Sequence, residues 1–210
     1  MTRTLLATLL LLLAVPSLAS AATLTTDRPC YIPGQPLRAT GSGWAPGSAW
    51  SVTGAGLSGS GTADGAGAFA FNTQAPTVAS STKPRTLALV GNQDGTEVAR
   101  TNIKVVSFLV DPKDPSGKPT GTTSWGFSGF TPGKPIFVHV KRGKKNYTEK
   151  AGKGDKPCGT LRTRLRRLPA VPPSQVSFGK YQVFVDNRRK FTKGGLQYKA
   201  TITIFRTAAN

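Results

Sequence analysis

The chain has 210 residues, of which 28 are lysine or arginine and nine are aspartate or glutamate, giving a formal net charge of +19. Its 24 glycines and 16 prolines follow no regular period, which excludes a collagen-like chain. One histidine and two cysteines cannot form a four-ligand structural zinc site unless a carboxylate joins them. We therefore expect no metal site and no cofactor.

Residues 1–21 are organised as a secretory signal peptide. Arg3 supplies the positive charge, an apolar stretch runs from Leu5 to Val15, and Ala19-Ser20-Ala21 resembles a cleavage site. A transmembrane helix needs about 20 apolar residues, so this stretch is too short for an anchor, and no later stretch is apolar enough to span a membrane. We predict a secreted or cell-envelope-associated protein whose mature part starts at residue 22.

The mature chain repeats one pattern in the same order. The turn Gly43-Trp44-Ala45-Pro46-Gly47 is matched 86 residues later by Gly129-Phe130-Thr131-Pro132-Gly133. In both copies the Pro-Gly dipeptide indicates a tight reversal that leads into an alternating strand. Residues 85–90 likewise correspond to 180–185, and 98–106 to 198–205. Three matches in one order predict an internal duplication.

Within each copy the apolar residues alternate with a period of two, which is typical of strands. About seven short strands fit each copy, so the sequence predicts two consecutive β-sandwiches in an all-β protein. We place the first at 22–105, a linker or first strand at 106–120, and the second at 121–210. Residues 161–168 also fit a short helix, because Leu161, Leu165 and Leu168 have helical spacing, but the alternation over 161–166 favours a strand.

These turn motifs carry a resemblance to a known family. The first copy resembles the bacterial immunoglobulin-like domains of exported proteins through the segments 28–35, 41–47 and 62–69, which read RPCYIPGQ, GSGWAPG and TADGAGAF. The second copy is similar to the divergent C-terminal partner of such tandems through the segment 129–134, His139 and Pro157-Cys158-Gly159. The resemblance implies an exported, non-catalytic module and assigns no binding residues.

Cys30 and Cys158 are the two cysteines of the chain, so one intramolecular disulfide is possible. An oxidising exterior would permit this bond. The alternative is two separately buried thiols, because the sequence does not show whether the two positions meet.

Positive charge is concentrated in the second copy. Residues 22–105 carry six basic and four acidic side chains, a net charge of +2, whereas residues 106–210 carry 21 and five, a net charge of +16. Three clusters account for much of this excess: Lys141, Arg142, Lys144 and Lys145; Arg162, Arg164, Arg166 and Arg167; and Arg188, Arg189 and Lys190. Arginines spaced two apart on a strand share one face at intervals of about 6.6–7 Å. Such a row suits the anionic groups of a polymer.

We therefore predict a non-catalytic binding or structural module that contacts an anionic cell-envelope polymer or a surface protein. Ordinary solvated surface charge is the alternative explanation for the same clusters. No nucleic-acid-binding motif accompanies the charge, so we expect no specific nucleic-acid partner.

An enzyme is the competing hypothesis. His139 precedes Cys158 by 19 residues, and exported cysteine transpeptidases also place a histidine before a nucleophilic cysteine. Those enzymes carry His-Gly immediately before the cysteine, where this chain has Lys156-Pro157. A reactive thiolate needs a base and a group that orients the base, and His139 sits in an alternating strand, where a half-exposed histidine is ordinary. We therefore expect no enzyme activity.

Overall fold

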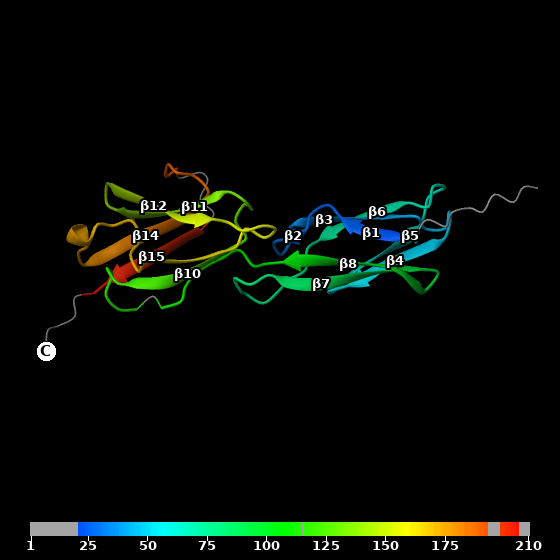
Figure 1. Cartoon of the computed structure of the whole chain (residues 1–210), viewed down its shortest axis with the longest axis horizontal. Coiled ribbons are helices and arrows are strands. Elements are labelled where there is room, and N and C mark those ends of the chain that lie inside the picture. Colours follow the sequence, from blue (N-terminus) through cyan, green and yellow to red (C-terminus); the bar gives the residue numbers. More distant parts are fainter. Residues whose placement is uncertain (1–20, 115, 193–197, 206–210) are drawn as a thin grey trace, which may run out of the picture.

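The computed structural model describes residues 21–114, 116–192 and 198–205. In these residues the chain forms fifteen strands and one short 3-10 helix, η1 (Pro173–Gln175). All but the last residue of the predicted signal peptide lie outside the described part of the chain. The fold is two consecutive immunoglobulin-like β-sandwiches, which Figure 1 shows arranged end to end along the long axis of the molecule.

The first sandwich contains a three-stranded sheet in the order β1-β3-β6 and a five-stranded sheet in the order β2-β8-β7-β4-β5. Neighbouring strands are antiparallel, except that β2 runs parallel to β8. The bounds are β1 (Thr23–Thr26), β2 (Cys30–Tyr31), β3 (Pro36–Ser42), β4 (Ala49–Gly54), β5 (Leu57–Thr62), β6 (Phe69–Gln74), β7 (Arg85–Gln93) and β8 (Thr96–Val105).

The second sandwich contains a three-stranded sheet in the order β13-β10-β9 and a four-stranded sheet in the order β12-β11-β14-β15, both antiparallel. The bounds are β9 (Leu109–Pro112), β10 (Thr122–Ser128), β11 (Pro135–Arg142), β12 (Lys145–Lys153), β13 (Leu161–Arg166), β14 (Gly179–Asp186) and β15 (Tyr198–Ile204). Residues 161–166 are thus a strand, and the helical alternative is wrong.

The two sandwiches share one strand plan apart from β2, which has no counterpart in the second, and the shared plan agrees with the duplicated turns. In each, the repeated turn joins the central strand of the three-stranded sheet, β3 or β10, to a strand of the other sheet, β4 or β11. Gly43 and Gly129 have φ values of +74° and +77°, and Gly47 and Gly133 have +73° and +74°. Glycine adopts these left-handed conformations readily because it has no Cβ. The matched glycines therefore place the same reversal in both copies.

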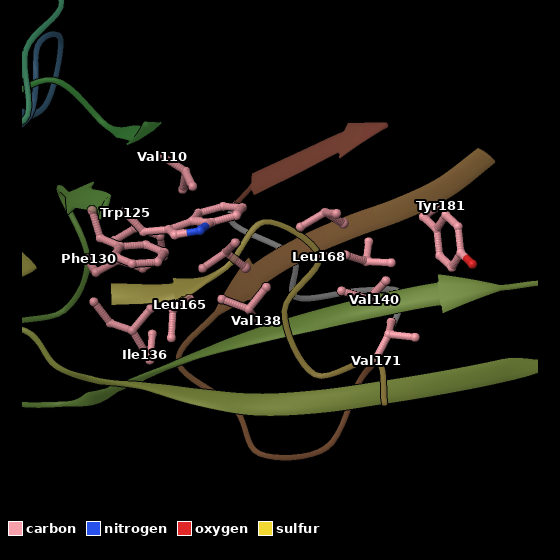
Figure 2. Close-up of a cluster of buried hydrophobic side chains, with 14 residues drawn as sticks. Val110, Trp125, Phe130, Ile136, Val138, Val140, Leu165, Leu168, Val171 and Tyr181 are labelled. Atoms are coloured by element: carbon pink, nitrogen blue, oxygen red, sulfur yellow. The ribbon is translucent and has the colours of Figure 1, made fainter. Parts of the chain in front are cut away.

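Each sandwich has its own core between its two sheets. Figure 2 shows the second core, in which Trp125 and Phe130 lie over Ile136 and Val138, with Tyr181 at the far side. The first core is built around Trp44, Trp50, Phe69 and smaller aliphatic side chains. Alternate residues of each strand point inward, which is why short strands with few apolar residues suffice to fill both cores.

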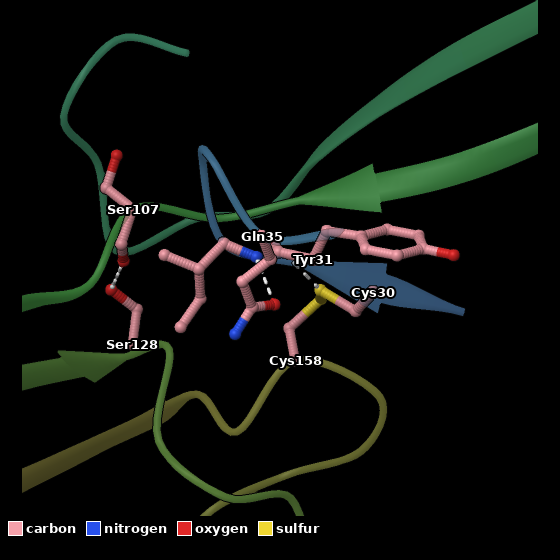
Figure 3. The surroundings of a disulfide bond; sticks show 7 residues. Cys30, Tyr31, Gln35, Ser107, Ser128 and Cys158 are labelled. Carbon is pink, nitrogen blue, oxygen red and sulfur yellow. Dashed lines mark hydrogen bonds between the residues drawn. A yellow bond between two sulfur atoms is a disulfide. The ribbon is translucent and has the colours of Figure 1, made fainter. Parts of the chain in front are cut away.

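The junction between the sandwiches consists of a short connecting segment and a disulfide bond. Residues 106–108 connect β8 to β9, and the Ser128 hydroxyl donates a hydrogen bond of 2.7 Å to the Ser107 carbonyl (Figure 3). Cys30 and Cys158 form a disulfide with a Cα–Cα distance of 5.3 Å, so the bond joins the first sandwich to the second. The predicted domain boundaries at 105 and 120 stay predictions. Strand β9 lies inside the segment 106–120, which was predicted to be a linker or a first strand.

Candidate anion-binding surfaces

The arginine row of β13 lies on the outer surface of the second sandwich. Arg162, Arg164 and Arg166 pair in register with Gly126, Ser124 and Thr122 of β10. The alternate residue Leu165 is buried in the core, so the three arginines are directed to the opposite face. Arg162 and Arg164 are exposed and Arg166 is half-buried. Strand β13 is an edge strand of its sheet. At one end of the row, Arg162 lines a cavity of about 340 Å³ together with Asp155 and residues 82–84 of the first sandwich.

Arg167, the neighbour of this row, has a local structural role. Its guanidinium forms an ion pair with Asp114 and donates a second hydrogen bond of 3.1 Å to the Asp114 carbonyl. The Ser116 hydroxyl and the Arg167 guanidinium both donate to the Asp114 carboxylate and hold its pKa below the ordinary value. Arg167 thus fastens the loop between β9 and β10.

The other predicted clusters lie in two separate places. Lys141, Arg142, Lys144 and Lys145 form the hairpin between β11 and β12. Strand β11 starts beside the junction, where Gly129 lies against Phe108 and Ile32, so this hairpin is at the end remote from the first sandwich. Arg188, Arg189 and Lys190 follow β14, which runs antiparallel to β11, and therefore lie toward the junction. The structure does not merge the clusters into one patch.

His139 is fully buried, so its expected half-exposed position is wrong. Its Nε2 lies 3.2 Å from Asp186 Oδ1 and 3.1 Å from the Arg188 carbonyl, and its Nδ1 lies 2.8 Å from the Thr148 hydroxyl. The Phe191 ring packs edge-on against His139 at a centroid distance of 5.7 Å. The loop after β14 therefore folds back over the outer face of the sheet and covers the imidazole, which alternation along β11 does not reveal.

The cysteine-enzyme hypothesis is not supported by this geometry. Cys158 is bonded to Cys30 and carries no free thiol. His139 instead contacts Thr148 and Asp186, and a substrate cannot reach an imidazole with no exposed surface. Among the described residues, no group of histidine, cysteine, aspartate or glutamate side chains is arranged to hold a metal ion.

Two further cavities lie near the disulfide and near the β11–β12 hairpin. One of about 510 Å³ borders the disulfide and is lined mainly by Tyr31, Ile32, Phe130 and prolines from both sandwiches. Another, of about 660 Å³, lies at the β11–β12 hairpin and includes Arg142 and Lys145. Its further lining residues, Ser174, Gln175 and Ser177, form no recognisable motif in the sequence. Their proximity to the hairpin depends on the path of residues 168–178 over the end of the sandwich.

No protein-family model matches the sequence, and no characterised protein matches it in a sequence search. Among solved structures, the chain is similar to FdeC, an adhesin of Escherichia coli, with 14% identity, a TM-score of 0.43, and coverage of 90% of this chain and 65% of the adhesin chain. The human OSCAR ligand-binding domain matches with 11% identity, a TM-score of 0.34, and coverage of 90% and 100%.

A Ca²⁺-stabilised adhesin of an Antarctic bacterium matches with 13% identity, a TM-score of 0.34, and coverage of 88% of this chain and 48% of that chain. This chain thus spans less than two thirds of both adhesin chains. Over the described residues, no helix has the length and hydropathy of a membrane span.

Proposed function

We propose that this protein is an exported, non-catalytic binding module that attaches to an anionic surface polymer through the arginine row of β13. The observation that carries the proposal is the placement of Arg162, Arg164 and Arg166 on the outward face of one edge strand. Their spacing of about 6.6–7 Å along the strand lets successive guanidinium groups contact successive phosphate, sulfate or carboxylate groups. A planar guanidinium can hold each such group through two hydrogen bonds.

The charge distribution gives the two sandwiches different tasks in this proposal. The second carries nearly all of the excess positive charge and supplies the attachment surface, while the first serves as a spacer or as a surface for a protein partner. The disulfide between Cys30 and Cys158 supports export, because such bonds persist in oxidising compartments. The signal-like segment 1–21 supports the same location.

The test is binding to two model polymers, heparin and long-chain polyphosphate, measured by titration over a range of salt concentrations. Reversal of Arg162, Arg164 and Arg166 to glutamate should greatly weaken binding at low salt. Each contact between a cation and a polymer anion contributes about 0.7–0.9 to the slope of log affinity against log salt. Loss of the three contacts should therefore reduce that slope by about 2–3.

A matched control separates this row from general charge. The variant Lys150→Glu, Lys180→Glu, Lys199→Glu changes the net charge by the same amount at exposed positions of the β12-β11-β14-β15 sheet. We expect it to retain most of the affinity. Equal weakening by both variants would show that binding follows overall charge and would refute the assignment to β13.

A further inference from the structure

The cavity at the far end of the second sandwich has the composition of an anion site. It has a volume of about 660 Å³ and is lined by Arg142, Gly143, Lys145, Tyr147, Ser174, Gln175, Val176 and Ser177. Two cations, three hydroxyl groups and one amide thus line this open cavity, and none of these described lining residues is acidic. Strand β13 contributes no residue to it, so it is separate from the arginine row.

Arg142 is held in position by contacts with the buried Tyr181 and with the backbone of Phe178. Its guanidinium donates hydrogen bonds of 3.1 Å to the Tyr181 hydroxyl and 2.7 Å to the Phe178 carbonyl, and it lies 5.0 Å from the centroid of the Tyr181 ring. The Tyr181 hydroxyl also bonds both backbone groups of Ser177 at 2.9 Å. A guanidinium has five N–H donors, and these contacts use two. A fixed guanidinium loses little conformational entropy when it binds.

Two other lining residues are also joined to each other. The Tyr147 hydroxyl donates a hydrogen bond of 2.7 Å to Gln175 Oε1, which links β12 to η1. Since this bond occupies the amide oxygen, the amide N–H₂ group of Gln175 is directed elsewhere and can serve a ligand as a donor. Hydroxyl and amide groups of this kind suit the hydroxyl groups of a sugar.

The pairing of the hairpin strands supplies an independent reason for an anion. Arg142 and Lys145 are directly opposite each other in the β11–β12 register and both line the cavity. Like charges at opposite positions of an antiparallel pair repel and destabilise it. An anionic group between the two side chains would remove that repulsion and contact both.

We propose that this cavity binds a sugar residue bearing a phosphate or sulfate ester, with the ester between Arg142 and Lys145. A lone oxyanion would fill little of the space, whereas the volume lies within the range typical of small-molecule sites. The hydroxyl groups of Ser174 and Ser177 and the Gln175 amide border the remainder of the cavity and contact the sugar ring. This site does not depend on polymer attachment at β13.

The experiment is a titration of the disulfide-bonded protein with glucose 6-phosphate, glucose 6-sulfate and glucose, followed by NMR and calorimetry. We expect the esters to bind, and glucose to bind at least tenfold more weakly, because the charged hydrogen bonds dominate. Binding of one ester alone would support the site and identify its anionic group. Equal affinity for glucose and both esters would overturn the proposal.

Two adjacent lysines provide the matched variants. Lys145 lines the cavity and Lys144 does not, and both are exposed, so neither substitution should disturb the fold. Lys145→Gln should weaken ester binding about tenfold, while Lys144→Gln, with the same loss of charge, should leave it unchanged. Equal effects of the two variants, or no effect of Lys145→Gln, would refute the site.

The same variants distinguish this inference from the proposed function. The triple glutamate variant at Arg162, Arg164 and Arg166 should keep its affinity for the sugar ester, and Lys145→Gln should keep most of its affinity for long polymers. Ester binding that disappears together with polymer binding in the triple variant would show that the ester binds at β13, and so would overturn the separate site.

Discussion

Asp27 shows how one side chain positions the segment that carries the disulfide. Its Oδ1 accepts hydrogen bonds of 2.8 Å from the Tyr31 hydroxyl and the Arg38 amide, and the Tyr31 hydroxyl also accepts one from the Arg28 amide. Burial on its own raises the pKa of the Asp27 carboxyl. The Arg38 amide, the Tyr31 hydroxyl and the nearby Arg28 charge outweigh burial, so the pKa lies below the ordinary value.

This lowered pKa predicts an acid-dependent stability. A carboxyl whose pKa is lower in the folded state stabilises the fold above its ordinary pKa near 4, and this contribution is lost as pH falls through the folded pKa. Asp27→Asn should therefore lower the free energy of unfolding at pH 7 more than at pH 2.5, as measured by urea denaturation. Tyr31→Phe, which removes one of the donors, should have a smaller effect of the same kind. Parallel losses at both pH values would contradict this account.

At the scale of elements, the loop from Gly154 to Gly159 brings the second cysteine to the junction. Gly159 has a φ of +61° and donates a hydrogen bond of 2.7 Å to the Asp155 carbonyl. A Cβ at Gly159 would lie 1.7 Å from the Phe130 carbonyl oxygen, a contact with backbone that cannot move aside easily. The loop therefore packs directly against the repeated turn of the second sandwich, and this contact positions Cys158.

Gly159→Ala should accordingly destabilise the protein by about 3 kcal/mol, from both the left-handed backbone and the steric overlap. Gly143→Ala is the matched control: its φ is also positive, at +56°, but nothing lies within 4 Å of the added methyl group. We expect a loss of about 1 kcal/mol there. Urea denaturation measures both losses of stability. Similar losses in the two variants would show that the left-handed backbone alone causes them and that the overlap with Phe130 contributes nothing.

At the scale of the whole molecule, the disulfide makes one body of two sandwiches. It joins residues 128 apart in sequence and lies beside the short connection at 106–108, so the junction is closed by two covalent paths. Gly126 of β10 also lies against the Thr82 side chain, which belongs to the loop between β6 and β7, so the two sandwiches pack against each other there as well. These connections restrict the movement of the first sandwich relative to the second, which carries the arginine row of β13.

Replacement of both cysteines by serine should therefore loosen the junction and lower stability. The loss of a cross-link over a loop of this size corresponds to about 4–5 kcal/mol in the chain-entropy model. Calorimetry measures the stability, and small-angle scattering should report a broader range of molecular extensions for the variant. A free-thiol count on the unfolded, unreduced wild-type protein provides the direct check: zero thiols are expected, and two would refute the bond.

Local patterns in the sequence determined much of this architecture. The alternation along each strand and the repeated Gly-aromatic-x-Pro-Gly turn predicted two β-sandwiches with one plan, because strand periodicity and turn conformation depend on residues that are neighbours in the chain. The placement of Arg162, Arg164 and Arg166 on one face follows from the same periodicity. These features could be derived without knowledge of any long-range contact.

Contacts between distant segments were decided by the tertiary structure alone. Two cysteines permit a disulfide, but only the packing of the loop at Gly159 against Phe130 brings Cys158 to Cys30. His139 has the sequence position of a half-exposed strand residue, yet Phe191 covers it from a loop about 50 residues later. The hairpin cavity also combines residues about 30 positions apart. Such burial depends on where remote loops fold, and strand periodicity carries no information about that.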